Sequence, residues 1–146
     1  MSDNIGMPVE ADSSPGGSFS RVVLIVEDSE QSAAPLEIAL LGIPGLSVLM
    51  ASSAMEALQM LHSGGAPVEA IVTDLNMPRM DGFELIRRVR SDQKLCGTPI
   101  IVVSADTDPT TPDRVARMGV SAFFPKPYSP AQVRRKLEQI LNGKTG

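Results

Sequence analysis

Residues 70–82 read AIVTDLNMPRMDG, which is the pattern of a strand, a loop and the start of a helix. A short apolar strand, Ala70–Thr73, ends on the carboxylate of Asp74, and Pro78 lies in the loop before a helix that opens near Gly82. In an open parallel α/β sheet, the loops spread apart at the carboxyl ends of the strands and leave a crevice that binds ligands. Asp74 is therefore predicted to lie at that edge, although a single Asp that ends a strand is more often a turn residue or a helix cap.

Three further predicted strands also end on side chains that carry chemistry. They are Val22–Val26 before Glu27 and Asp28, Ile100–Val103 before Ser104 and Ala105, and Ala122–Phe124 before Pro125, Lys126 and Pro127. The intervals are 46 residues from Asp28 to Asp74, 30 from Asp74 to Ser104, and 22 from Ser104 to Lys126. Each interval is long enough for a strand and helix unit. Three carboxylates, a hydroxyl and an ammonium are thus expected at one edge of the sheet.

The residue types at this edge indicate a hard metal ion and phosphoryl chemistry. Three neighbouring carboxylates repel one another, and an all-oxygen ligand set suits Mg²⁺. A bound Mg²⁺ would keep Asp74 ionised and neutralise an incoming phosphoryl group, which is how carboxylate nucleophiles form acyl phosphates. Lys126 would contact phosphate oxygens, and the Ser104 hydroxyl and the Ala105 amide would donate hydrogen bonds. The alternative structural reading is a simple ion-pair cluster of the carboxylates with Lys126.

The composition favours one domain in a reducing compartment. A chain of 146 residues is large enough to bury roughly two-thirds of its unfolded surface. The single cysteine, Cys96, allows no internal disulfide. A net charge of -4 argues against direct nucleic-acid binding, which depends on clustered Lys and Arg. No apolar run approaches the roughly 20 residues of a membrane span, and the amino terminus lacks the pattern of a secretory signal.

Four motifs at the strand ends, VEDS, TDLNMPRMDG, SA and FPKP, resemble in order and spacing those of the receiver domain of two-component response regulators. The family includes the single-domain chemotaxis regulators, and the resemblance covers Arg21 to about Asn142. It implies a doubly wound α/β fold that is flavodoxin-like and CheY-like, with a five-stranded parallel sheet in the order 2-1-3-4-5 flanked by five helices. The expected domains are a disordered tail over residues 1–20 and a receiver domain over residues 21–146.

The pattern of strands and helices agrees with such a fold. Strand and helix patterns alternate five times, and strands that are apolar throughout are typical of a parallel sheet covered on both faces. The first and fifth helices are expected on one face and the second, third and fourth on the other. The tail holds mainly Gly, Ser, Pro, Asp and Glu, and such a segment buries too little surface to offset its ordering entropy.

Several local features of the helices are also predicted. Ser29 is expected to cap the first helix, and Pro35 predicts either a late start near Ala33 or a kink. Ser53 and Glu56 form a capping-box pattern at the start of the second helix. The sole histidine, at the end of that helix, is expected to be structural. The third helix is expected to turn its arginines toward water, namely Arg87, Arg88 and Arg90.

The resemblance implies a role for each residue at the strand ends. Asp74 would be the phosphoacceptor, and Lys126, Ser104 and Ala105 would contact the phosphoryl group. The metal ion would be Mg²⁺, in preference to other cations. Its ligands would be Asp28, Asp74, the backbone carbonyl of Asn76 and, through water, Glu27.

The resemblance also implies a conformational switch. Ser104 would move toward the phosphoryl group, and Phe123 would rotate into the space that opens. Tyrosine is often found at the position of Phe123, and without a hydroxyl the inward rotamer would be favoured by apolar burial alone. Asn76 and Asp106 would tune dephosphorylation. The partner surface would comprise the fourth helix, the fifth strand and the fifth helix, with Phe123, Tyr128 and the proline-rich loop Asp106–Pro112 at its centre.

The expected function is that of a phosphoacceptor signalling domain in a phosphorelay. A sensor histidine kinase or a phosphotransfer protein would donate the phosphoryl group, and a downstream protein would bind the phosphorylated form. The domain would act in the cytoplasm as a monomer or a weak, phosphorylation-dependent dimer, with no direct nucleic-acid or membrane partner. It would catalyse its own phosphorylation and dephosphorylation but would turn over no separate substrate, and so would not be an enzyme in the usual sense.

Three alternatives remain open at the sequence level. A haloacid-dehalogenase-like phosphatase also uses an Asp at a strand end, but it would be expected to have a second acid two residues later, where this chain has Asn76. A receiver fold could serve as a phosphate-independent interaction scaffold. The chain could also be a receiver module from a hybrid kinase or a multidomain regulator, although Met1 and the stop soon after Asn142 favour a single-domain protein.

Overall fold

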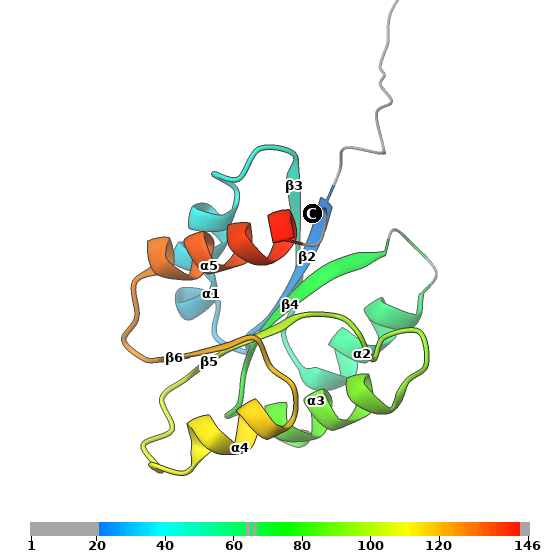
Figure 1. Cartoon of the computed structure of the whole chain (residues 1–146), viewed down its shortest axis with the longest axis vertical. Helices are drawn as coiled ribbons and strands as arrows, with labels where there is room; N and C mark the ends of the chain where they lie inside the picture. Colours follow the sequence, from blue (N-terminus) through cyan, green and yellow to red (C-terminus); the bar gives the residue numbers. More distant parts are fainter. Residues whose placement is uncertain (1–20, 64, 66, 144–146) are drawn as a thin grey trace, which may run out of the picture.

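The computed structural model describes residues 21–63, 65 and 67–143, so the tail predicted over residues 1–20 lies outside the described residues. Strands and helices alternate along the chain and are labelled as in Figure 1. The elements are β2 (Arg21–Val26), α1 (Glu30–Leu40), β3 (Leu46–Ala51), α2 (Ala54–His62), β4 (Val68–Asp74), α3 (Gly82–Ser91), β5 (Ile100–Ser104), α4 (Thr111–Arg117), β6 (Ala122–Pro125) and α5 (Pro130–Gly143). The predicted alternation is confirmed.

The strands form one parallel sheet. Its five strands lie in the order β3-β2-β4-β5-β6, which is the predicted order 2-1-3-4-5 when the strands are counted along the chain. The register aligns the ends of neighbouring strands, because Val26 pairs with Thr73 and Ser104 pairs with Pro125. All the predicted strand-end residues therefore reach the same edge of the sheet.

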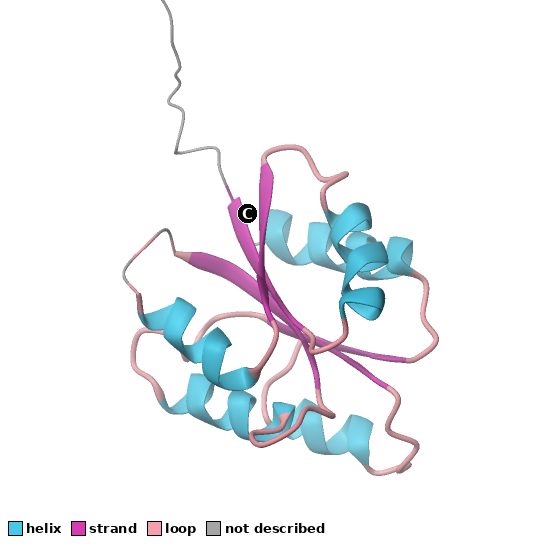
Figure 2. Ribbon diagram, turned by 180° about the vertical axis from the view of Figure 1, so that it is seen from behind, coloured by secondary structure: helices cyan, strands magenta, loops and turns pink. Residues whose placement is uncertain are grey.

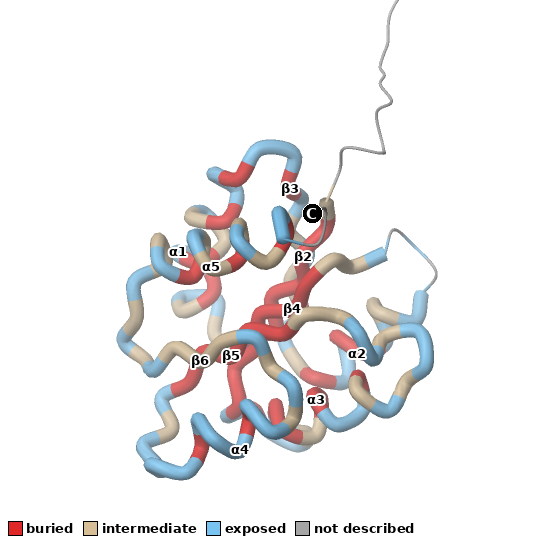
Figure 3. The backbone as a smooth tube through the Cα atoms, viewed as in Figure 1, coloured by how far each residue is buried: buried red, intermediate tan, exposed pale blue. Residues whose placement is uncertain are grey.

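Helices cover both faces of the sheet, as Figures 1 and 2 show, and an apolar layer lies between the sheet and the helices on each face. The helices α1 and α5 cover one face and α2, α3 and α4 cover the other, as predicted. Alternate residues of each central strand point to opposite faces, so that Ile71 joins one layer and Val72 the other. This two-sided burial explains why the central strands are apolar throughout, and in Figure 3 these strands are mostly coloured as buried.

The first two helices begin where side chains satisfy their free amides. The Ser29 hydroxyl accepts a hydrogen bond from the Ser32 amide at 3.3 Å, and α1 runs through Pro35, so the alternative of a late start was wrong. Proline removes one backbone hydrogen bond, which the cap and the buried residues of the helix offset. The Ser53 hydroxyl accepts from the Glu56 amide at 3.1 Å, but the Glu56 carboxylate accepts from Ser52 instead of completing the box.

The start of α3 lies directly against the end of β4. Asp81 caps the helix, with its carboxylate accepting from the Glu84 amide at 2.9 Å. The Gly82 amide donates to the Leu75 carbonyl at 2.9 Å. A Cβ atom on Gly82 would clash with the carbonyl oxygen of Asp74 and would lie 2.7 Å from Leu75 Cα. Glycine is needed here because the two backbones approach too closely for any side chain.

The prediction that all three arginines of α3 face water is wrong for Arg90. Its guanidinium donates to four backbone carbonyls, those of Cys96 and Thr98 at 2.9 Å, Gly119 at 2.9 Å and Met118 at 3.2 Å. Partial burial lowers its pKa. The loop before β5 and the residues after α4 fold over this side chain, so Arg90 joins α3 both to the loop that follows it and to the distant end of α4.

The remaining helices begin as predicted. Thr111 and Pro112 open α4, which ends before Gly119 at a positive φ of 84°. Pro130 opens α5, and the Ser129 hydroxyl accepts from the Gln132 amide at 3.4 Å. The longest described helix, α5, has 14 residues, and within the part of the chain that the structure describes no helix is both long and apolar enough to cross a membrane.

Candidate functional site

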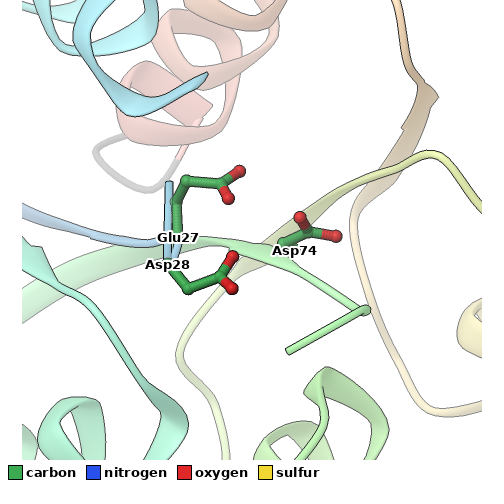
Figure 4. Close-up of side chains that lie close together, drawn as sticks. All are labelled: Glu27, Asp28 and Asp74. Carbon is green, nitrogen blue, oxygen red and sulfur yellow. The ribbon is translucent and has the colours of Figure 1, made fainter. Parts of the chain in front are cut away.

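Three carboxylates lie together at the carboxyl edge of the sheet. Glu27 and Asp28 directly follow β2, and Asp74 is the last residue of β4 (Figure 4). One carboxylate oxygen from each residue lies within 4.8 Å of the others. Glu27 and Asp74 are buried, whereas Asp28 is exposed. The sheet register thus turns residues 46 positions apart in the sequence into neighbours.

Lys126 bridges the two buried carboxylates. Its ammonium donates to Glu27 Oε1 at 2.8 Å and to Asp74 Oδ2 at 2.9 Å. The lysine is held in place because its backbone amide donates to the Ser104 carbonyl at 2.7 Å, directly after β6. Burial alone would lower the pKa of Lys126, but the hydrogen bonds to Glu27 and Asp74 outweigh it and raise the pKa. The side chain therefore stays protonated.

Glu27 lies in a less favourable environment for a charge. Burial raises the pKa of its carboxyl group, against the lowering effect of the hydrogen bonds from Lys126 and from the Ser29 amide at 3.2 Å. Repulsion from Asp74 raises it further. Three carboxylates facing one ammonium leave an excess negative charge at this edge. Such an all-oxygen set at close range fits a hard divalent cation, Mg²⁺ first.

Ser104 and Asn76 lie beside Asp74 at the same edge of the sheet. The Ser104 hydroxyl is fully buried at the end of β5 and accepts from the Asp106 amide at 3.0 Å and from Asn76 Nδ2 at 3.4 Å. The backbone amide of Asn76 donates to Asp74 Oδ1 at 3.1 Å. Asn76 therefore contacts both Asp74 and Ser104, while Ala105 is exposed beside them.

One contact near the site has no counterpart in the sequence predictions. The Thr111 hydroxyl donates to Asp106 Oδ2 at 3.1 Å, and the Thr111 side chain is buried. Asp106 was expected at the site, but its attachment to the first residue of α4 was not. The sequence holds no signal for this pair, because the contact depends on how the loop between the two residues folds.

Two aromatic side chains of the predicted partner surface pack on opposite faces of the sheet. Phe123 packs against the apolar layer under α2, α3 and α4. Tyr128 packs against the opposite layer, under α1 and α5, and lines a cavity of about 420 Å³ together with Gln31 and Pro35 of α1. Because β6 is the edge strand of the sheet, a surface formed by α4, β6 and α5 also spans both faces, and this partner surface stays a prediction.

His62, which was expected to have a structural role, joins two helices. Its Nε2 atom lies 2.8 Å from Asp92 Oδ2, which links the end of α2 to the end of α3. The hydrogen bond from His62 is the main cause that lowers the pKa of Asp92. His62 thus has the structural role predicted for it, well away from the carboxylate cluster.

Comparisons with known proteins agree with this geometry. The family model for the response regulator receiver domain matches residues 23–138. The chemotaxis protein CheY of Pseudomonas aeruginosa is 32% identical over 124 residues, which covers 85% of this chain and 98% of that protein. A chemotaxis protein CheY homolog of Campylobacter jejuni subsp. jejuni is 31% identical over 124 residues, with 85% of this chain and 95% of that protein covered.

The fold comparison leads to the same family. The chemotaxis response regulator CheY4 of Vibrio cholerae has a solved structure that matches with a TM-score of 0.71 and 28% identity, and the match covers 83% of this chain and 98% of that one. The shared fold places the strand ends of this chain at one edge, where the carboxylates, Ser104 and Lys126 gather. With a matching family model over most of its length, the chain belongs to the response regulator receiver domain family.

Proposed function

We propose that this receiver domain accepts a phosphoryl group on Asp74 from the phosphohistidine of a sensor kinase or phosphotransfer protein, with Mg²⁺ bound. The observation that carries the proposal is the position of Asp74, a buried carboxylate in an acidic cluster whose second oxygen is held by Lys126. A carboxylate oxygen forms the new O–P bond while the P–N bond of the phosphohistidine breaks and its electron pair returns to the imidazole.

Each neighbouring side chain has a role in this transfer. The backbone amide of Asn76 and the ammonium of Lys126 each donate to one oxygen of Asp74, which fixes the orientation of the carboxylate. Glu27, Asp28, Asp74 and the Asn76 carbonyl are suited to hold Mg²⁺, which when bound supplies positive charge against the phosphoryl oxygens. Lys126 adds a second positive charge, and the Ser104 hydroxyl and the Ala105 amide donate to the transferred group.

The aspartyl phosphate is expected to be short-lived. Asn76 lies beside Asp74, and its small polar side chain leaves room for a water molecule to attack in line. The site thereby catalyses its own phosphorylation and dephosphorylation without turning over a separate substrate. The proposed output is a change in partner binding at the surface formed by α4, β6 and α5, in the cytoplasm, by a monomer or a weak dimer.

A phosphatase of the haloacid dehalogenase type fits the site less well. Such an enzyme would need a second acid two residues after Asp74. Asn76 occupies that position, and its amide side chain cannot protonate a leaving group as a carboxylic acid does. The side chain instead donates to Ser104. A phosphate-independent scaffold would have no use for a buried, lysine-bridged cluster of acids, because such clusters cost stability.

The proposal is tested by intact mass measurement after incubation with a small acyl phosphate and Mg²⁺. One phosphoryl group is expected on the wild-type chain, and none is expected on Asp74→Asn, which keeps the shape of the side chain but lacks the nucleophile. Omission of Mg²⁺ should abolish labelling. Labelling of Asp74→Asn at the wild-type rate would show that another residue accepts the phosphoryl group.

A further inference from the structure

We propose that Asp106 and Thr111 are positioning residues that tie the start of α4 to the Ser104 hydroxyl, so that the position of Ser104 sets the position of the helix. The inference rests on the proposed function for the event that moves Ser104, namely phosphorylation of Asp74. It assigns Asp106 a structural link to α4, in addition to the role in dephosphorylation that resemblance suggests.

The hydrogen bonds of Ser104 show why its movement would be transmitted. A hydroxyl oxygen can accept two hydrogen bonds and donate one. The Ser104 oxygen already accepts two, from Asn76 Nδ2 and from the Asp106 amide. Its proton remains available for a phosphoryl oxygen. When the hydroxyl is drawn toward phosphorylated Asp74, the bond from the Asp106 amide must stretch or break.

Asp106 passes this displacement on through its carboxylate. Oδ1 accepts from the Asp108 amide at 2.8 Å, and Oδ2 accepts from the Thr111 hydroxyl at 3.1 Å. Thr111 is the first residue of α4 and is only 2% exposed, so its hydroxyl has no free access to solvent as an alternative partner. The carboxylate therefore joins the loop after β5 to the first turn of α4.

The first turn of α4 depends on the hydrogen bond between Thr111 and Asp106, because the side chain at the N-cap position makes no capping hydrogen bond. Thr110, at the N-cap position, has helical backbone angles and makes no capping hydrogen bond with its side chain. The helix has only seven residues, and Thr111 and Val115 are its buried ones. Helices this short are not stable on local interactions alone. The buried contacts of Thr111 thus help to hold the first turn.

The other end of α4 is fixed independently. Arg90 of α3 donates to the carbonyls of Met118 and Gly119, the residues that follow the helix. Loss of the bond between Asp106 and Thr111 would free the first turn while Arg90 still holds the last. The helix would then tilt about its carboxyl end, which changes the surface that α4 presents to a partner.

Two neighbouring threonines provide a matched test by amide NMR. Thr111→Val keeps the shape of the side chain and removes the hydroxyl that reaches Asp106. Thr110→Val is the control, because the Thr110 hydroxyl donates at 2.8 Å to Asp108, a carboxylate of the same loop that makes no contact with Ser104. Spectra are recorded with and without Mg²⁺ and beryllofluoride, a phosphoryl mimic, together with thermal melts to confirm folding.

The expected result is specific to Thr111. Without the mimic, the amide signals of α4 in Thr111→Val should lie toward their positions in mimic-bound wild type, and their hydrogen exchange should be about tenfold faster, the loss of about one hydrogen bond or 1.4 kcal/mol. Addition of the mimic should then move these signals less than half as far as in wild type, while the Ala105 signal still responds. Asp106→Ala, which leaves Thr111 intact, should give the same α4 pattern.

Two outcomes would overturn the inference while leaving the proposed function intact. One is a full wild-type response of α4 in Thr111→Val and Asp106→Ala. The other is an equal loss in Thr110→Val, which would indicate a general loosening of the loop. If the wild-type Ala105 signal itself failed to respond to the mimic, the proposed phosphorylation of Asp74 would fail, and this inference with it.

Discussion

Asp28 is the exposed member of a cluster in which three carboxylates share one lysine. Glu27 and Asp74 each receive a hydrogen bond from Lys126, whereas no such bond from Lys126 reaches Asp28. Its charge therefore adds repulsion unless a cation balances it. This excess of negative charge, which suits the site to Mg²⁺, is expected to reduce the stability of the metal-free protein.

Asp28→Asn should raise the free energy of unfolding in the presence of a chelator by about 1 kcal/mol, because one of three neighbouring charges is removed. The stabilisation of the wild type by added Mg²⁺ should disappear in this variant, since a ligand is lost. Thermal melts with chelator and with Mg²⁺ measure both effects. Asp113→Asn, on the exposed surface of α4, should keep the wild-type response to Mg²⁺. A variant Asp28→Asn that remains fully stabilised by Mg²⁺ would show that the ion binds elsewhere.

The positions of these charged residues could be predicted from the sequence, because each one ends an apolar strand and parallel strands end at a common edge. The partners within loops could not. The bond between Asp106 and Thr111 depends on backbone turns over residues 104–111, which no periodicity encodes. The need for glycine at position 82 was also missed, since the close approach of α3 to β4 appears only when both are placed.

In α3, helical periodicity predicts the wrong exposure for one side chain, that of Arg90. Arg87 and Arg88 are exposed and pair with Glu84 on their own helix, as a solvated face predicts. Arg90 falls next to them in the pattern, but the segments around Thr98 and Met118 fold over it. The periodicity of a helix cannot reveal that residues outside the helix will bury one of its side chains.

Arg90→Met should lower the free energy of unfolding by about 2 kcal/mol, because four backbone carbonyls lose a charged donor. Urea denaturation of wild type and variant gives this difference. Arg88→Met is the matched control on the same helix, where loss of an exposed pair with Glu84 should cost less than about 1 kcal/mol. Equal effects of the two substitutions would mean that the Arg90 contacts contribute no more than a surface ion pair.

At the scale of the whole molecule, the order of the strands and the distribution of helices over the two faces agree with the sequence predictions. Repeated β-α units and fully apolar strands leave few arrangements, and the resemblance to the receiver family selected the strand order among them. The partner surface at α4, β6 and α5 stays a prediction. Tyr128 follows β6 by only three residues, yet it lies on the face of α1 and α5, while Phe123 lies on the opposite face.

The two adjacent phenylalanines of β6 allow a test of how the signal crosses the sheet. Phe123 packs on the side of α4, and Phe124 packs on the side of α1 and α5. With fluorine-labelled phenylalanine, the Phe123 signal should shift when beryllofluoride and Mg²⁺ bind, because the space released by Ser104 changes its surroundings. The Phe124 signal should change little. A Phe123 signal that stays constant while the mimic binds would rule out rotation of this side chain as the switch.

The central claim is that Asp74 carries the phosphoryl group, and chemical trapping of that bond tests it most directly. Borohydride reduces an aspartyl phosphate to homoserine and leaves free carboxylates unchanged. After phosphorylation with an acyl phosphate and Mg²⁺, peptide mass mapping should find homoserine at position 74 in the wild type and unreduced carboxylates at Glu27 and Asp28. Reduction to an alcohol at another Asp or Glu instead, or complete absence of homoserine from a protein whose intact mass shows a phosphoryl group, would contradict this assignment.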